Sequence, residues 1–569
     1  MRPRFSLTLA GPAVLLAACS TASPPPSAAP AERAAPVTAA AISAADLQAK
    51  LFAFSDDSMQ GRESGTIGNV RATNYLAREA KRLGLEPAGD GGTFFQTIPM
   101  KDRMVAEDAA LSVDGSPLVL WTDYAPLPSL GSFLPFGASG SLDGAAVVYG
   151  GRLADSTVQL EPAAYAGKVV LLSAPLRNGA PEWQIWMVGG LDRYPGAVGI
   201  AVATLDISPP GIVGFLRGPQ TFLDDERPGG ARPLGMLVTA AAAERLLGAS
   251  LEAALPGTVG RRIGGTFRFE MQPTDQPARN VVAILRGSDP VLRNEYVALG
   301  AHNDHVGMAD QPLDHDLVWA QMHVLQPEGA DSPPRPPTAA DSARITAILD
   351  SLRALRPPRP DSIFNGADDD GSGSIALLEI AQVLASRPQK PRRSLLFVWH
   401  TAEEKGLYGS QYFTEHPTVP RDAIVAQLNL DMIGRGTAGD VAGGGPGYMQ
   451  LIGSRRLSTE LGDLVETANR DGRYGFTFDY QYDANGHPSQ FYCRSDHYQY
   501  ARWGIPVVFF TTGSHPEYHQ LTDEAQYIDY AKMARVTALV MDIAARVANL
   551  NHRPVVDGPK PDPYGACVQ

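Results

Sequence analysis

Two adjacent carboxylates, Glu403 and Glu404, closely follow a short apolar run at residues 395–399. A short apolar run between polar residues is typical of a strand that is buried on both faces, as in a parallel sheet. In open α/β sheets, ligands bind beyond the carboxyl ends of the strands. Considered alone, the pair also fits a solvated turn, but its position predicts an α/β fold with a site at this sheet edge.

Three other apolar runs end near side chains that bind metals or assist catalysis. Residues 296–301 lead to His302, Asp304 and His305, residues 424–430 lead to Asp431, and residues 505–511 lead to Tyr518 and His519. An acidic run, Asp368 to Asp370, precedes a helix that we expect at about residues 375–385. Because parallel strands share one carboxyl edge, we expect these side chains to form one site.

The predicted fold class is α/β, with a mostly parallel central sheet sandwiched by helices and an inserted β-rich domain. A length of 569 residues favours two or three domains. We assign the catalytic domain to residues 44–105 and 273–550, and the inserted domain to residues 106–272. The inserted region has short apolar runs broken by Gly and Pro. We expect it to wall the mouth of the active site, although a purely structural role stays open.

A second, proline-rich insertion is predicted at residues 308–364, inside the catalytic domain. It contains an expected amphipathic helix at residues 339–355. A loop of this length is usually functional or disordered, so we expect it to cover the site as a lid. We interpret its two histidines, His315 and His323, as solvated side chains.

The first residues resemble a bacterial lipoprotein signal. Residues 1–19 contain two arginines and then an apolar stretch that ends in Cys19, the residue expected to carry the lipid. An ordinary cleaved signal peptide is the alternative. Residues 20–43 read as a flexible linker, and residues 551–569 as a polar tail. We therefore expect an exported lipoprotein of the outer membrane, facing the periplasm or the cell surface.

Composition limits the partners. The net charge of −13 disfavours nucleic acid, because no basic patch is available to neutralise phosphates. We expect contact with a membrane only through Cys19, and the sequence does not predict an oligomeric state. The other two cysteines, Cys493 and Cys567, either pair in an exported protein or remain thiols.

The chemistry of the ligand set favours zinc. Neutral imidazole and carboxylate groups suit zinc, and a catalytic zinc keeps an open position for water. Two histidines and three carboxylates are too many for one such site, but they suit two zinc ions that share a carboxylate. Asp369 suits the shared position, because negative charge is favoured at a helix N-terminus. Neither a P-loop nor a Gly-x-Ser-x-Gly elbow follows these strands, which disfavours nucleotide binding and serine hydrolase chemistry.

The sequence resembles the co-catalytic zinc exopeptidases of the MH clan, which include bacterial leucyl-type aminopeptidases and glutamate carboxypeptidase II. The matching stretches are residues 300–307, 365–373, 401–410, 429–435 and 518–519, in the order of that family. Residues 167–172 and 195–202 also resemble the protease-associated domain of many exopeptidases. The resemblance implies the same α/β fold and two zinc ions per chain.

The resemblance also implies a role for each matching residue. The implied metal ligands are His302, Asp369, Glu404, Asp431 and His519, with Asp369 bridging the two ions. Glu403 is the implied general base, Asp304 the carboxylate that orients His302, and Tyr518 the group that stabilises the oxyanion. A cis peptide is implied between Asp369 and Asp370. We assign no ligand role to His305, to His400 (packing at a strand end) or to His497 (with Asp496 at a helix start).

The function that we infer from the sequence is that of a zinc metallopeptidase, with an aminopeptidase that hydrolyses N-terminal residues from peptides as the favoured activity. A carboxypeptidase or dipeptidase of the glutamate carboxypeptidase type is an alternative. It would need a cationic pocket, for which Arg435, Arg455 and Arg494 are candidates. A glutaminyl cyclase-like acyltransferase uses one zinc, and a binding protein would lack ligands. The complete ligand set disfavours both.

Overall fold

The computed structural model describes residues 41–569 apart from positions 129–135, 138, 156, 178, 186–189, 210, 225–231, 331–336 and 566. The expected signal peptide, Cys19 and residues 20–40 of the expected linker lie outside the described residues. In the part of the chain that is described, no helix is both long and apolar enough to cross a membrane.

The central sheet has four neighbouring parallel strands in the order β21, β18, β22 and β25. They are β18 (Tyr296–His302), β21 (Ser394–His400), β22 (Ile424–Leu430) and β25 (Val507–Thr511). These strands fall on the four apolar runs. Only β25 begins later than the run, after Pro506, which has no amide hydrogen to donate to a sheet ladder.

Further strands extend the sheet on both sides of these four. On one side lie β17 (Ala278–Leu285), β1 (Glu86–Pro87) and β2 (Phe95–Ile98), and on the other lie β23 (Tyr448–Ile452) and β24 (Thr477–Asp479). β17 pairs antiparallel with β21, and β23 pairs antiparallel with β25. The expected α/β fold class is therefore confirmed, with a central sheet that is parallel in its middle and joined to its flanking strands by antiparallel pairing.

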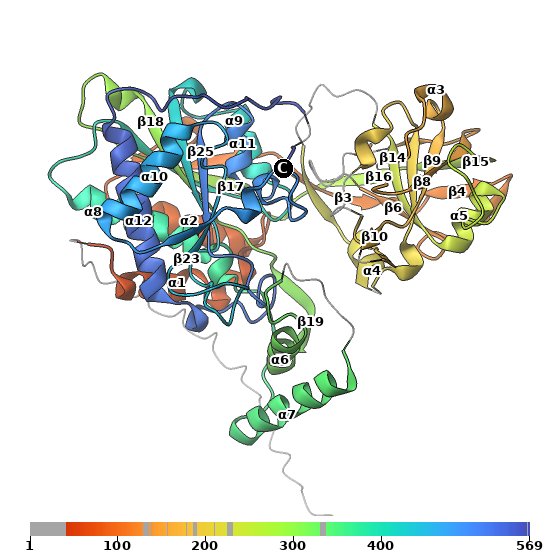
Figure 1. The fold of residues 1–569 in the computed structure, drawn as a ribbon, viewed down its shortest axis with the longest axis horizontal. Helices are drawn as coiled ribbons and strands as arrows, with labels where there is room; N and C mark the ends of the chain where they lie inside the picture. The colour runs from red at the N-terminus through yellow and green to blue at the C-terminus, as the bar shows by residue number, and fades with distance from the viewer. Residues whose placement is uncertain are drawn as a thin grey trace, which may run out of the picture. The chain divides into compact units, whose positions relative to one another are not determined.

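Helices cover both faces of this sheet (Figure 1). One face packs against α1 (Ala44–Phe54), α2 (Ile67–Arg82), α8 (Gly373–Ser386), α10 (Thr459–Gly472) and α12 (Tyr530–Asn549). The other face packs against α9 (Tyr408–Glu415) and α11 (His497–Ala501). Strand residues alternate between the two hydrophobic clusters, as side chains on a pleated strand must.

The inserted region has a sheet and hydrophobic clusters of its own. Its strands are β3 (Met100–Val105), β4 (Ala110–Val113), β5 (Ser116–Leu118), β6 (Tyr124–Leu127), β7 (Gly140–Ser141), β8 (Ala146–Arg152), β9 (Val169–Ser173), β10 (Leu176–Arg177), β11 (Ala180–Pro181), β12 (Gly199–Ala203), β13 (Gln220–Leu223), β14 (Leu234–Val238), β15 (Val259–Phe267) and β16 (Phe269–Pro273). Its α-helices are α3 (Pro162–Tyr165), α4 (Gly211–Arg217) and α5 (Ala240–Leu247). The core strands β8, β9, β12 and β14 are parallel neighbours, so the region is β-rich with mixed α/β character, as expected.

The described residues of the second insertion form two strands and two α-helices. β19 (Met308–Asp314) pairs antiparallel with β20 (Pro360–Ile363), and α6 (His315–Leu325) and α7 (Ala339–Leu355) lie between them. α7 matches the helix expected at residues 339–355. It begins at a capping box in which Thr338 and Asp341 satisfy one another's backbone amides.

The two histidines of this insertion correct the expectation of solvated side chains. His315 is buried, and its Nε2 atom lies 3.2 Å from Oε2 of Glu524. His323 is one-quarter exposed and contacts the buried carboxylate of Glu517. Both partners lie about 200 positions later in the sequence, so local patterning gave no sign of these contacts.

Cys493 and Cys567 form a disulfide, which decides the alternative that the sequence left open. The bond ties the C-terminal tail to the segment that precedes α11.

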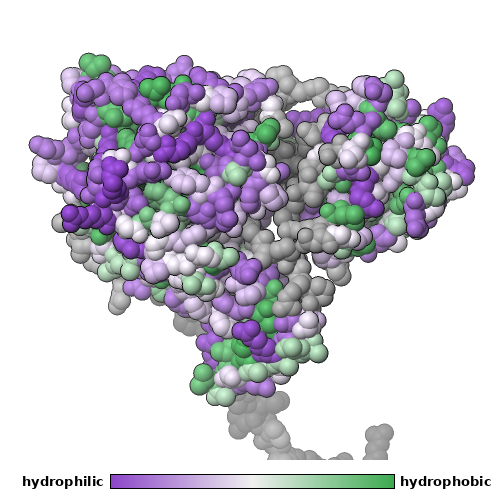
Figure 2. Space-filling view, in the orientation of Figure 1, coloured by the Kyte–Doolittle hydropathy of each residue, from purple (hydrophilic) through white to green (hydrophobic). Residues whose placement is uncertain are grey.

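Figure 2 shows hydrophilic residues over much of the visible surface, with hydrophobic residues scattered among them.

Candidate metal centre

The predicted site residues meet at the carboxyl edge of the parallel strands. His302 is the last residue of β18, Asp431 follows β22, and Glu403 and Glu404 follow β21. Asp369 precedes α8 and is joined to Asp370 by a cis peptide bond, as the family resemblance implied. The topology therefore brings together segments that are far apart in the sequence.

Three side chains form a first group of candidate metal ligands: His302, Asp369 and Asp431. Nε2 of His302 lies 3.0 Å from Oδ1 of Asp369 and 3.7 Å from Oδ1 of Asp431. All three residues are buried. Ser495 donates a hydrogen bond of 2.7 Å to the other oxygen of Asp431, which fixes the orientation of that carboxylate.

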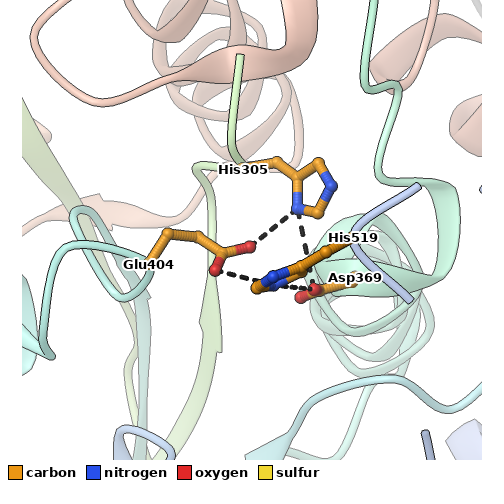
Figure 3. Close-up of side chains that lie close together, drawn as sticks. All are labelled: His305, Asp369, Glu404 and His519. Atoms are coloured by element: carbon orange, nitrogen blue, oxygen red, sulfur yellow. Dashed lines mark hydrogen bonds and ion pairs between the residues drawn. The ribbon is translucent and has the colours of Figure 1, made fainter. Parts of the chain in front are cut away.

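Four side chains form a second group, and they point toward one another in Figure 3: His305, Asp369, Glu404 and His519. Nε2 of His519 lies 3.1 Å from Oδ2 of Asp369 and 2.9 Å from Oε2 of Glu404. Nδ1 of His305 lies 2.7 Å from Oε1 of Glu404 and 3.7 Å from Oδ2 of Asp369. Asp369 thus offers one carboxylate oxygen to each group.

Backbone contacts hold the segment around Asp369. The carboxylate of Asp523 accepts hydrogen bonds from the amides of Asp368 and Asp369. Asp370 accepts from the amide of His302 at 2.9 Å and from that of Gly373 at 2.9 Å. These contacts connect the start of α8 directly to the end of β18.

Arg62 is a fully buried side chain that ties two of the site loops together. Its guanidinium donates to the carbonyl of Asn303 at 3.3 Å, of Asn365 at 2.6 Å and of Gly366 at 2.8 Å. Arg62 was given no role from the sequence. A buried arginine is rare unless its hydrogen-bond donors are satisfied. Its partners here are carbonyl groups of distant residues, and no local pattern in the sequence indicates them.

The electrostatics of the site favour a cation. Burial opposes the ionisation of Asp369, yet the adjacent His302 and His519 hold its pKa well below its usual range. Burial lowers the pKa of His519, but Glu404 and Asp369 raise it to about 10. Burial raises the pKa of the Glu403 carboxyl well above its usual range. Such shifts arise where several carboxylates converge, and divalent metals satisfy this arrangement.

The donor set fits zinc. Imidazole nitrogens and carboxylate oxygens are both zinc ligands. Among the described residues, Oδ2 of Asp369 and Nε2 of His519 are buried and have no hydrogen-bond partner, although they lie 3.1 Å apart. Atoms that converge without hydrogen-bonding one another are the arrangement expected around a shared ion. The residues present therefore fit zinc.

Residues 280–544 match a family model described as Peptidase family M28. This part of the chain belongs to peptidase family M28. The M28 segment contains both groups of candidate ligands. Arg62 lies outside it, so residues before the M28 segment also support the site.

Two curated relatives each match part of this chain. A probable leucine aminopeptidase of Trichophyton verrucosum (strain HKI 0517) is 27% identical over 216 residues, which are 36% of this chain and 55% of the relative. Leupeptin-inactivating enzyme 1 of Streptomyces exfoliatus is 31% identical over 169 residues, which are 29% of this chain and 33% of the relative. The chain spans about half the length of the first of these relatives.

A solved structure is similar over most of both chains. The aminopeptidase from Aneurinibacillus sp. strain AM-1 aligns with a TM-score of 0.49 at 16% identity, and the match covers 91% of this chain and 97% of that one.

A cavity of about 950 Å³ opens beside the two ligand groups of the M28 domain. Glu403 and Tyr518 both line it, and the Tyr518 ring stacks on the His519 ring with centroids 3.9 Å apart. Apolar side chains line the same cavity: Val306, Phe364, Met432, Phe491 and Phe509.

Asp304 lies beside His302, but its carboxylate makes no short contact with that ring. Oδ1 of Asp304 is 3.7 Å from Nδ1 of His302, whereas the backbone carbonyl of Asp304 is 3.1 Å from the same nitrogen. The carboxylate accepts a hydrogen bond of 3.2 Å from the amide of Glu403. In this geometry Asp304 contacts both the first ligand group and the base that we predicted.

Three histidines were given no ligand role from the sequence, and one of them lies in the metal centre. His305 belongs to the second group, and the signal that could have revealed it is its position directly after Asp304 at the same strand end. His400 packs at the end of β21, where it contacts the hydroxyl of Tyr500 at 2.9 Å, as expected. His497 is the first residue of α11, also as expected.

The three arginines that were candidates for a cationic pocket lie in different environments. Arg494 lines the cavity. Arg435 is buried in contact with Asp440 and Glu517, and Arg455 pairs with Asp463 and Glu466. One of the three therefore faces the cavity.

Proposed function

We propose that this protein is a zinc-dependent aminopeptidase that binds two zinc ions and removes N-terminal residues from peptides. The observation that carries the proposal is the pair of ligand groups that share Asp369 and adjoin a cavity lined by Glu403. In this assignment His302 and Asp431 would hold one ion, Glu404 and His519 would hold the other, and Asp369 would contribute a carboxylate oxygen to each.

The chain's own residues supply the proton transfers and the orientation. When bound, two zinc ions acidify a water molecule and polarise a carbonyl group. Glu403 lines the cavity, so its carboxylate takes a proton from that water and delivers it to the leaving amine. Tyr518 donates its hydroxyl hydrogen to the developing oxyanion. Asp304 holds His302 and Glu403 in place through the contacts described above.

The comparisons favour aminopeptidase over carboxypeptidase specificity. The Trichophyton relative is described as a probable leucine aminopeptidase, and apolar side chains share the lining of the cavity here with polar ones. A carboxypeptidase for acidic peptides would need several cations around the substrate carboxylate, and two of the three candidate arginines are engaged elsewhere. The five-ligand set also disfavours the single-zinc cyclase alternative.

The test is digestion of one peptide set in free, N-acetylated and C-amidated forms, followed by mass spectrometry. We expect stepwise loss from the N-terminus, abolished by N-acetylation and by a zinc chelator and restored by added zinc. Loss from the C-terminus that amidation blocks would instead establish a carboxypeptidase. Cleavage that survives complete metal removal would overturn the zinc mechanism.

His305 gives a prediction specific to this chain. Because its Nδ1 atom lies within the second ligand group, we expect His305→Ala to weaken retention of the ion held by Glu404 and His519. Loss of a supporting partner typically lowers metal affinity by about 10–100-fold. Zinc retained after dialysis against a weak chelator measures this. His400→Ala is a matched control, because His400 is also a buried strand-end histidine but belongs to neither group.

A further inference from the structure

The insertion at residues 308–364 connects two of the loops that carry candidate ligands. β19 begins at Met308, shortly after His305, and β20 ends at Ile363, shortly before Asp369. The amide of Phe364 donates to the carbonyl of Gly307 at 3.0 Å, which closes the base of the insertion. The insertion thus starts and ends beside the metal centre.

α6 of this insertion also contacts the loop that carries His519. His323 contacts the carboxylate of Glu517, and His315 lies 3.2 Å from Glu524. The amide of Ala330 donates to the carbonyl of Ser514 at 2.9 Å. These contacts fall on both sides of His519 in the sequence, so the insertion contacts the loop both before and after the candidate ligand.

His519 needs such support more than the other candidate ligands do. Residues 512–524, all of which the structure describes, form neither helix nor strand. His519 has a positive φ of 56°, a conformation that costs free energy for a residue with a side chain and persists where the surroundings enforce it. Its side chain is 35% exposed, whereas that of His302 is 1% exposed at the end of a strand.

Glu517 is the link between α6 and His519. Its buried carboxylate accepts a hydrogen bond of 2.9 Å from Arg435 and lies 3.1 Å from Nδ1 of His515, in addition to the contact with His323. When a buried carboxylate loses one hydrogen-bond donor, the folded protein loses stability unless the carboxylate moves toward solvent. Such a movement would shift Tyr518 and His519, which follow it directly in the chain.

α6 is itself held firmly. Asp316, in its first turn, contacts three arginines of the same insertion: Arg353, Arg356 and Arg359. Several charge-assisted hydrogen bonds to one buried carboxylate fix the helix against the rest of the insertion. α6 therefore provides a rigid support rather than a loose cover.

We propose that the 308–364 insertion is a brace for the metal centre and that His323 is a positioning residue, which keeps His519 in ligand geometry through Glu517. The proposal rests on the proposed function, because it takes His519 as a zinc ligand. It gives the insertion a role different from that of a lid.

The experiment compares His323→Ala, His323→Gln and wild type in the full chain. Zinc affinity is measured by chelator competition for each of the two ions, together with kcat and KM on a peptide substrate. We expect His323→Ala to weaken one of the two ions by about 10–100-fold and to lower kcat more than it raises KM. His323→Gln retains a side-chain donor and is expected to recover most of the affinity.

His552→Ala is the matched control, because Nε2 of His552 contacts Glu460 at 2.7 Å on the exposed surface. We expect it to leave both ions and the kinetics unchanged. Thermal melting of the zinc-free proteins separates general destabilisation from loss of metal, since a merely structural role lowers the melting temperature without changing affinity. Equal zinc affinities in wild type and His323→Ala would overturn the brace, whereas a wild type that binds no zinc would overturn the proposed function itself.

Discussion

Replacing Glu403 with glutamine is expected to lower kcat by about 10²–10⁴-fold while both zinc ions remain bound. Glutamine has nearly the same shape, but it cannot accept a proton from water and return it to the leaving amine. Glu403 belongs to neither ligand group, so metal content should not change. Steady-state kinetics combined with elemental analysis for zinc measures both quantities on the same sample.

Glu63→Gln is a suitable control for this prediction. Glu63 lines the same cavity, but its carboxylate pairs with Lys405 and lies in neither ligand group. We expect this variant to keep a kcat close to that of wild type. If Glu403→Gln turns over substrate as fast as wild type does, Glu403 has no part in the mechanism.

Replacing Asp369 with asparagine is expected to remove most of the zinc from both positions, and activity with it. Each ligand group contains one oxygen of this carboxylate, so one substitution weakens both groups at once. An asparagine of the same size is neutral and presents an amide in place of one oxygen. Elemental analysis after gel filtration should give well below two zinc ions per chain.

Asp483→Asn is the matched control for metal content. Asp483 is a largely buried carboxylate that pairs with Arg456 at 2.6 Å and belongs to neither ligand group. We expect it to retain the zinc of wild type. Circular dichroism should show that Asp369→Asn keeps its secondary structure, and a full complement of two zinc ions in that variant would refute the bridge.

The regular elements of the M28 domain could be predicted because their signals are local. The apolar runs at residues 296–301, 395–399 and 424–430 became β18, β21 and β22, since a strand buried on both faces must be apolar throughout. The helix expected at residues 339–355 formed because its capping residues lie within one turn of its start. The edge of the sheet at which the site lies could be predicted from the direction of the parallel strands alone.

The predictions for single histidines were less successful, because burial and partners depend on distant segments. His315 and His323 lie in a proline-rich insertion and were expected to be solvated, yet each contacts a glutamate of the loop around His519. His305 looked redundant beside His302, and its place in the second group depends on where Glu404 lies. The role of Arg62 depends on carbonyl groups more than 240 positions away.

The sequence by itself determined the α/β class, the four parallel strands of the central sheet and the set of ligand types at their carboxyl ends. Periodicity and capping act over a few residues, so local patterns in the sequence reveal these features. The tertiary structure alone decided which oxygen of Asp369 faces each group, that Cys493 pairs with Cys567, and that α6 contacts the loop of His519. These depend on distances between segments that packing brings together, and no local pattern encodes such distances.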